Sequence, residues 1–284
     1  GIRDAQESRG LGDVYKRPGA DDYAQSVDID HGILKLIRMG RLTATSCLSL
    51  SPHWREAAAA ISPDIRQQAD IGLHLDFTQF SYPLRLPHPQ LVIRSLLRQL
   101  NQEQIQAAIR LQLDAFEKEL GSAPDYIDGH QHVHQLPQIR DALLSELQSR
   151  YSGKRPWLRI SHPAHDGMKG LVISALGSRT MRKLALKRGF STTRTLLGVY
   201  SFNSKAESYL AQLNQWLAVV ASGNAKGQPY ALMCHPGLVS ADQTDPIGQA
   251  RPIEYEVLAS DAFNESLAAL NIIPVKGSEL FAKA

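Results

Sequence analysis

The chain has 284 residues, of which 43% are hydrophobic and 21% charged, and its formal net charge is +3. This apolar content excludes a chain that is disordered throughout, and so small a basic excess argues against a nucleic-acid partner. Cys47 and Cys234 are too few for a disulfide framework, although a single bridge stays open. No stretch approaches the roughly 20 apolar residues of a membrane span, and residues 1–20 lack a secretory signal. We therefore expect a cytoplasmic protein without a membrane span.

Apolar segments of strand length alternate with longer amphipathic segments, a pattern typical of parallel β/α units. The apolar or Thr-rich runs predict strands over residues 42–50, 69–77, 126–128, 157–160 and 230–234. Apolar residues spaced by three and four predict helices over residues 29–39, 53–61, 90–100, 102–120, 137–149, 168–189, 206–221 and 253–270. Asn101 is a suitable N-cap for the helix 102–120, and Gly121 a suitable C-terminal glycine. The pattern predicts an α/β fold, a TIM-like (β/α) barrel that is regular or distorted, with a doubly wound open sheet as the alternative.

The first strand of this pattern is not visible in the sequence. The segment where it should stand is polar and contains Pro18 and Gly19, which argue against a central strand. We therefore expect the first strand to be missing or replaced. Residues 13–17 also look like translated adapter DNA, so residues 1–18 are interpreted as a non-native or disordered segment. Residues 19–284 are expected to form a single domain.

Residues able to carry chemistry recur where predicted strands end. They fall into four groups along the chain: Asp21-Asp22, His74, the run from Asp128 to His134, and His235. In a (β/α) barrel these strand ends share one face, where active sites lie. Carboxylates and imidazoles together suit a divalent metal ion, and three protein ligands leave coordination positions open for catalysis. The pattern therefore predicts a catalytic metal site.

Most of these features also have a structural explanation. Adjacent aspartates are most often a solvated turn, a lone His74 in an apolar strand is most often a satisfied core or rim residue, and His235 before a proline fits a turn. The run of His130, His132 and His134 is different, because three histidines after a strand are costly to bury unless they bind, stack or titrate. Extended alternation would point all three to one side, and we expect one or two of them to serve substrate or structure.

The ordered motifs resemble a known family, the YdjC-like carbohydrate deacetylases, which include chitooligosaccharide deacetylases and a deacetylase of hopanoid biosynthesis. The residues that carry the resemblance are Asp21-Asp22-Tyr23, Gly72-Leu73-His74, Asp128-Gly129-His130-Gln131-His132-Val133-His134 and Met233-Cys234-His235-Pro236. The resemblance runs from about residue 20 to the C-terminus. The sequence departs from the family in its first strand and in Tyr23-Ala24-Gln25, where Phe-Gly is commoner.

The resemblance implies a (β/α) barrel related to polysaccharide deacetylases and hydrolysis of an N-acetyl group on an amino sugar. It implies that Asp22, His74 and His130 hold one divalent metal, Mg²⁺ in the family, although the same ligands would suit Zn²⁺. By analogy with the polysaccharide deacetylases it also implies three catalytic roles: Asp21 as general base, His235 as general acid and Arg159 as the arginine beside the base. Asp128 is interpreted as a residue that orients one of the histidines.

The expected function is therefore a carbohydrate N-deacetylase that acts on a small acetylated amino sugar through a metal-activated water. One alternative is another metal-dependent amidohydrolase or a phosphoesterase, which a second metal per chain would favour. The other is a non-catalytic sugar-binding barrel, which turnover of an N-acetyl sugar would eliminate. A homodimer is expected from the prevalence of such assemblies alone.

Overall fold

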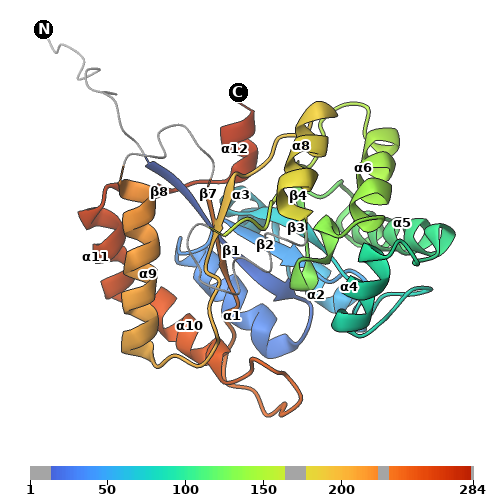
Figure 1. Cartoon of the computed structure of the whole chain (residues 1–284). Helices are drawn as coiled ribbons and strands as arrows, with labels where there is room; N and C mark the ends of the chain where they lie inside the picture. Colours follow the sequence, from blue (N-terminus) through green and yellow to red (C-terminus); the bar gives the residue numbers. More distant parts are fainter. Residues whose placement is uncertain (1–13, 164–176, 223–229, 283–284) are drawn as a thin grey trace, which may run out of the picture.

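The computed structural model describes residues 14–163, 177–222 and 230–282 (Figure 1). Its strands form one parallel sheet in the order β5-β4-β3-β2-β1-β7-β6, and β8 pairs with the first residues of β1. The strands are β1 (Val14–Tyr23), β2 (Ala44–Cys47), β3 (Asp70–Leu75), β4 (Tyr126–Gly129), β5 (Trp157–Leu158), β6 (Thr195–Leu197), β7 (Tyr230–Cys234) and β8 (Ile272–Pro274). The helices are α1 (Val27–Arg38), α2 (Trp54–Ala59), α3 (Pro63–Gln68), α4 (His88–Leu96), α5 (Gln102–Leu120), the 3₁₀ helix η1 (His130–Gln135), α6 (Ile139–Arg150), α8 (Arg179–Lys187), α9 (Ala206–Ala221), α10 (Ala250–Ala259), α11 (Asp261–Ala269) and α12 (Gly277–Phe281).

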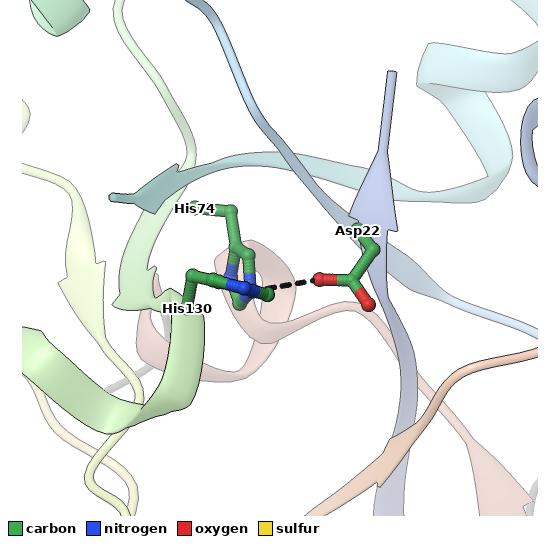
Figure 2. Close-up of side chains that lie close together, drawn as sticks. All are labelled: Asp22, His74 and His130. Atoms are coloured by element: carbon green, nitrogen blue, oxygen red, sulfur yellow. Dashed lines mark hydrogen bonds and ion pairs between the residues drawn. The ribbon is translucent and has the colours of Figure 1, made fainter. Parts of the chain in front are cut away.

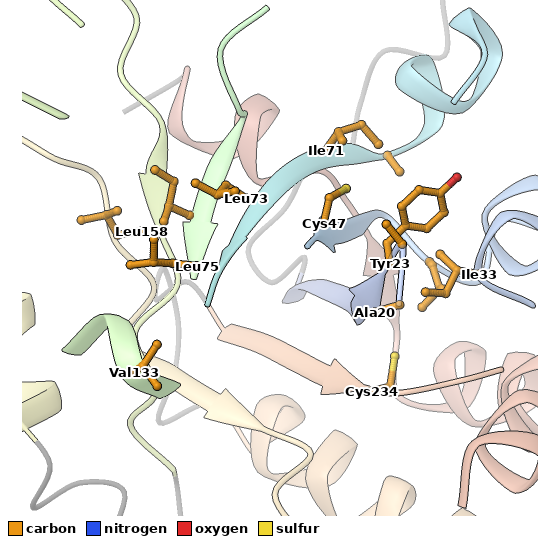
Figure 3. Packing of buried hydrophobic residues seen from close by; sticks show 14 of the residues in the cluster. Ala20, Tyr23, Ile33, Cys47, Ile71, Leu73, Leu75, Val133, Leu158 and Cys234 are labelled. Carbon is orange, nitrogen blue, oxygen red and sulfur yellow. The ribbon is translucent and has the colours of Figure 1, made fainter. Parts of the chain in front are cut away.

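The helices cover the sheet and enclose its core. Helices α9, α10 and α11 lie to one side of the strands and α4, α5 and α6 to the other (Figure 1). Every residue of β2, β3 and β4 is buried, which is typical of parallel strands covered by helices. Ala20, Leu73 and Leu158, from three strands, belong to one buried apolar cluster (Figure 3). The predicted α/β class is therefore confirmed.

The two ends of the sheet approach each other without a continuous ladder between β5 and β6. Isolated bridges join Leu158 to Thr192 and Pro163 to Leu196. The Leu196 amide also donates to the carbonyl of His162 at 2.9 Å. In the part of the chain that the structure describes, the sheet is thus an incomplete parallel barrel, and a fully closed TIM barrel is not formed.

The expectation that the first strand is missing is wrong. Strand β1 lies in the middle of the sheet, paired with β2 on one side and β7 on the other. Pro18 removes only one backbone donor, because its carbonyl still accepts from the Thr43 amide at 3.0 Å. Gly19 pairs with Ala44 of β2 and with Met233 of β7, so it belongs to both ladders. Residues 14–18 are therefore strand. Residues 1–13 lie outside the described part of the chain, so their non-native origin stays a prediction.

Several predicted elements have the bounds that the sequence indicates. Helices α5 and α9 and strand β7 begin and end where they are expected. Asn101 caps α5, since its side-chain oxygen accepts from the Gln104 amide at 3.0 Å, and Gly121 ends it with a φ of 68°. Among the described helices none is both long and apolar enough to cross a membrane.

The elements that the sequence analysis missed are short. Strands β6 and β8 have three residues each, and helices α3 and α12 have six and five. Such segments hold too few residues for a hydrophobic period to emerge. The helix expected over 168–189 appears as α8, while residues 164–176 lie outside the described part of the chain.

Candidate active site

The carboxyl ends of the parallel strands bring the predicted site residues together. These residues are Asp21 and Asp22 at the end of β1, His74 in β3, Asp128 in β4, His130 in η1, Arg159 after β5 and His235 after β7. A cavity of about 490 Å³ opens at this edge, lined by Asp21, Asp22, His74, His130 and His235 among others. The convergence predicted from the strand ends is therefore what the structure shows.

Asp22, His74 and His130 form a compact set of potential metal ligands (Figure 2). Asp22 Oδ1 lies 3.0 Å from His130 Nδ1 and 3.4 Å from His74 Nε2. One donor atom from each residue lies within 4.8 Å of the others, and the side chains of Asp22 and His74 are buried. Two imidazoles and one carboxylate that open onto a cavity fit a divalent cation with free coordination positions.

A second set of possible ligands, Asp21, His74 and Asp128, lies beside the first. Arg159 lies between its two carboxylates, with Nη2 at 2.6 Å from Asp21 Oδ2 and 2.8 Å from Asp128 Oδ2. A guanidinium there supplies the positive charge that a metal would otherwise bring. Asp22, His74 and His130 all line the cavity, whereas Asp128 is not among its lining residues, so the set around Asp22 is the better candidate for a cation that meets a substrate.

Asp128 orients His74. Its Oδ1 lies 2.6 Å from His74 Nδ1, and the Ser46 hydroxyl lies 3.1 Å from the same nitrogen. A carboxylate on one ring nitrogen directs the other nitrogen toward a metal and fixes the ring. Burial alone would lower the pKa of His74, but the carboxylates of Asp128, Asp21 and Asp22 raise it to about 10.

Asp21 is held in its charged form by Arg159. The guanidinium donates two parallel hydrogen bonds, from Nη1 to Oδ1 at 2.7 Å and from Nη2 to Oδ2 at 2.6 Å. Both side chains are buried. Burial alone would raise the pKa of Asp21, but the Arg159 charge holds it below the usual value of a carboxyl. Asp21 is therefore a carboxylate at neutral pH.

His235 follows β7, which pairs with β1 on the side opposite β2 and β3, so in the sheet it approaches Asp21 from the side away from His74. Its Nε2 lies 3.9 Å from Asp21 Oδ2, and its ring packs edge-on against Phe202 with centroids 5.1 Å apart. Its backbone amide donates to Glu254 Oε2 at 2.6 Å. Within the described residues its Nδ1 has no hydrogen-bond partner. The imidazole is thus held by its backbone and by ring packing.

The expectation that the three histidines after β4 point to one side is wrong. They lie in η1, where Gln131 and His132 have positive φ values of 51° and 62°. His130 and His132 line the cavity, whereas His134 is buried and its Nε2 donates to the Arg159 carbonyl at 2.9 Å. His134 therefore supports the strand end that carries Arg159.

Gly129 permits the tight turn from β4 into η1. A Cβ at this position would lie 2.7 Å from His134 Nδ1 and 2.8 Å from the His134 backbone nitrogen. Contacts this short require the backbone to move. The glycine between Asp128 and His130 is therefore a requirement of the site's geometry.

Two residues of α10 belong to the site and were missed. Arg251 Nη2 donates to Asp22 Oδ2 at 2.9 Å. Glu254, one turn later, accepts from the His235 amide and from the hydroxyls of Tyr200 and Tyr209, at 2.6 and 3.3 Å. The available signal was an arginine and a glutamate three residues apart, shortly after the strand-end His235, but such a pair usually marks a solvated helix face.

Comparison with known proteins places these motifs in a family. The model of the YdjC-like protein family matches residues 19–269. A chitooligosaccharide deacetylase of Proteus mirabilis (strain HI4320) is 25% identical over 268 residues, covering 88% of this chain and 92% of the relative. A carbohydrate deacetylase of Danio rerio is 25% identical over 266 residues, covering 81% and 83%.

Solved structures share the fold. A protein of Enterococcus faecalis V583, described as a candidate cellobiose-phosphate cleavage protein, aligns with a TM-score of 0.72 at 20% identity over 96% of this chain and 100% of its own. A peptidoglycan N-acetylglucosamine deacetylase aligns with a TM-score of 0.50 at 12% identity over 95% and 93%. These likenesses concern the fold, and the family model confirms the resemblance seen in the motifs. The chain belongs to the YdjC-like family.

Proposed function

We propose that the protein is a carbohydrate N-deacetylase that removes an acetyl group from an N-acetylated amino sugar with the help of one divalent cation. The observation that carries the proposal is the set Asp22, His74 and His130, open to the cavity, with Asp21 beside it and His235 within reach. The deacetylase names of the family's curated relatives support this reaction class.

Asp22, His74 and His130 would hold the cation, which we propose to be Mg²⁺, with Zn²⁺ as the alternative. Bound there, a divalent ion would polarise the acetyl carbonyl and lower the pKa of a water molecule. Asp128 contributes by holding His74 with its Nε2 toward Asp22. Because these three ligands line the cavity, they would hold the cation next to the acetamido group of a bound sugar.

Asp21 is the proposed general base. Hydrolysis forms a bond from a water oxygen to the acetyl carbon, breaks the bond from that carbon to the sugar nitrogen, and transfers a proton from the water. A carboxylate kept ionised by Arg159 is able to accept that proton. Because Arg159 stays charged, it would also compensate the buried negative charge of Asp21 before the transfer.

His235 is the proposed general acid. The departing sugar amine needs a proton when the carbon–nitrogen bond breaks, and the imidazole lines the same cavity as Asp21. A proton donated from the ring would complete the hydrolysis to acetate and free amine. Positioned acid–base groups of this kind contribute about 10²- to 10⁴-fold in rate.

We propose a small chitooligosaccharide such as diacetylchitobiose as substrate, because a cavity of about 490 Å³ suits a small sugar. The homodimer and the cytoplasmic location that the sequence suggests stay predictions.

Acetate release tests the reaction class. We expect the protein to release acetate from diacetylchitobiose and to leave a free amine that amine-reactive reagents detect. An O-acetylated sugar and a sugar phosphate serve as comparison substrates. Phosphate release without acetate release, with two metals bound per chain, would favour the phosphoesterase alternative. Sugar binding without any turnover would favour the non-catalytic barrel.

A further inference from the structure

Arg251 is a buried cation placed directly against a proposed metal ligand. Its side chain is 4% exposed, and its Nη2 donates to Asp22 Oδ2 at 2.9 Å. The other guanidinium nitrogens reach Asp245 Oδ2 from Nε and the His235 carbonyl, at 3.5 Å, from Nη1. The guanidinium of Arg251 therefore joins Asp22, the connection formed by residues 236–249, and the strand end that carries His235.

The two carboxylate oxygens of Asp22 face different partners. Oδ1 lies 3.0 Å from His130 Nδ1 and 3.4 Å from His74 Nε2. Oδ2 lies on the other side, in the hydrogen bond with Arg251. A planar carboxylate held in this way presents one oxygen to the histidines and keeps the second away from them.

We infer that Arg251 is a positioning residue that keeps Asp22 a one-oxygen ligand, so that more coordination positions stay open for water and the acetyl oxygen. The inference rests on the proposed function, because it concerns the cation that Asp22, His74 and His130 would hold. It assigns a role to a residue of α10 that makes no direct contribution to the ligand set.

The charge of Arg251 separates this role from a merely structural one. A guanidinium so close to the ligand carboxylate repels a bound dication, so metal affinity alone would be better served by a neutral residue. If Arg251 sets the ligand's denticity, its removal frees Oδ2 to bind the ion and leaves affinity equal or higher. If Arg251 only holds the fold together, its removal weakens affinity together with stability.

The test compares Arg251→Met and Arg251→Lys with the wild type, using Co²⁺ alone as the probe. Arg155→Met is the matched control, because Arg155 is a half-buried arginine that binds the carbonyls of Tyr151 and Arg188. The readouts are the Co²⁺ Kd, the visible absorption spectrum of bound Co²⁺, Tm, and kcat and KM for diacetylchitobiose. The spectrum reports the coordination of the ion independently of turnover.

The inference predicts that Arg251→Met binds Co²⁺ at least as tightly as the wild type, shows an altered Co²⁺ spectrum, and loses about 10- to 100-fold in kcat with KM little changed. Arg251→Lys, which retains a cation, should restore part of the kcat. Arg155→Met should match the wild type in Kd, spectrum and kcat.

A wild-type spectrum and kcat in Arg251→Met would overturn the inference, and so would a raised Kd that accompanies a lowered Tm in both variants. Failure of the proposed function itself looks different, since the wild-type protein would then bind no Co²⁺ or release no acetate.

Discussion

Asp128 and His74 lie in adjacent strands, with Asp128 Oδ1 2.6 Å from His74 Nδ1. This contact turns His74 Nε2 toward Asp22. The same carboxylate uses its other oxygen against Arg159 Nη2, at 2.8 Å. One buried aspartate thus connects a proposed metal ligand with the arginine that holds the proposed base. A substitution at Asp128 should therefore affect both the orientation of His74 and the position of Arg159.

Asp128→Asn should lower metal affinity or kcat by about 10- to 100-fold, the usual cost of losing a partner that orients a ligating histidine. The amide keeps the size of the side chain but loses the negative charge that aligns His74. Calorimetric titration with the metal, together with steady-state kinetics, measures both effects. Asp114→Asn is the control, because Asp114 is an exposed residue paired with Arg150. Equal behaviour of the two variants would contradict the role of Asp128.

Asp21→Asn should retain the metal and lose turnover, by about 10²- to 10⁴-fold. The amide cannot accept the proton of the attacking water, whereas Asp22, His74 and His130 are left in place. Metal content by elemental analysis and kcat with diacetylchitobiose distinguish the two properties. Turnover equal to that of the wild type would rule out Asp21 as the general base.

Gly129→Ala should disrupt the turn that places His130. The new methyl would lie 2.7 Å from His134 Nδ1, and overpacking of this kind costs about 2 kcal/mol. We expect a lower Tm and a weaker metal affinity in this variant. Gly153→Ala is the matched control, since a Cβ at Gly153 meets nothing within 4 Å. A Gly129→Ala protein with wild-type Tm and affinity would show that the turn adapts without cost.

Asp30 should make stability depend on pH. Its buried side chain, in α1, accepts from the Ala24 amide at 2.6 Å, and burial raises its pKa to about 7. The folded state therefore keeps a proton that the unfolded chain has already released. The contribution of Asp30 to the free energy of unfolding is fully present below about pH 4. It is lost as the pH rises from there to about 7, and the free energy of unfolding falls by about 1.4 kcal/mol per pH unit over this range.

Asp30→Asn tests this dependence, because the amide retains an acceptor for Ala24 and does not titrate. Denaturant unfolding of both proteins between about pH 5 and 8 gives the difference in unfolding free energy. We expect the wild type to lose stability relative to the variant as the pH rises. Parallel curves for the two proteins would mean that Asp30 keeps its usual pKa.

The parts of the site that could be predicted from the sequence are those that depend on local order. His74 and Asp128 stand at the ends of apolar runs, and the ends of parallel strands share one edge whatever the exact number of strands. Arg251 depends instead on a contact between residues 229 positions apart. The hydrophobic periodicity of the sequence carries no information about such a contact. The charged residues at the start of α10 are therefore expected, from the sequence alone, to lie on a solvent-exposed face.

The expectations that failed, a missing first strand and an extended histidine run, have separate physical causes. Strand β1 contains Pro18 and Gly19, whose local preferences oppose a strand, but its pairing with strands on both sides outweighs them. The histidine run alternates as a strand would, but Gly129 lets the chain turn into η1. In β1, therefore, contacts with distant strands override the local pattern, whereas after β4 a local turn at a glycine ends the strand before the histidines.

Acetate release from diacetylchitobiose by metal-stripped protein, with Mg²⁺ or Zn²⁺ added back, tests the central claim most directly. We predict that the stripped wild-type protein is inactive, that one added metal per chain restores acetate release, and that Asp22→Ala is inactive and does not bind the metal. Acetate release that continues at full rate without metal, or that persists in Asp22→Ala, would contradict the account.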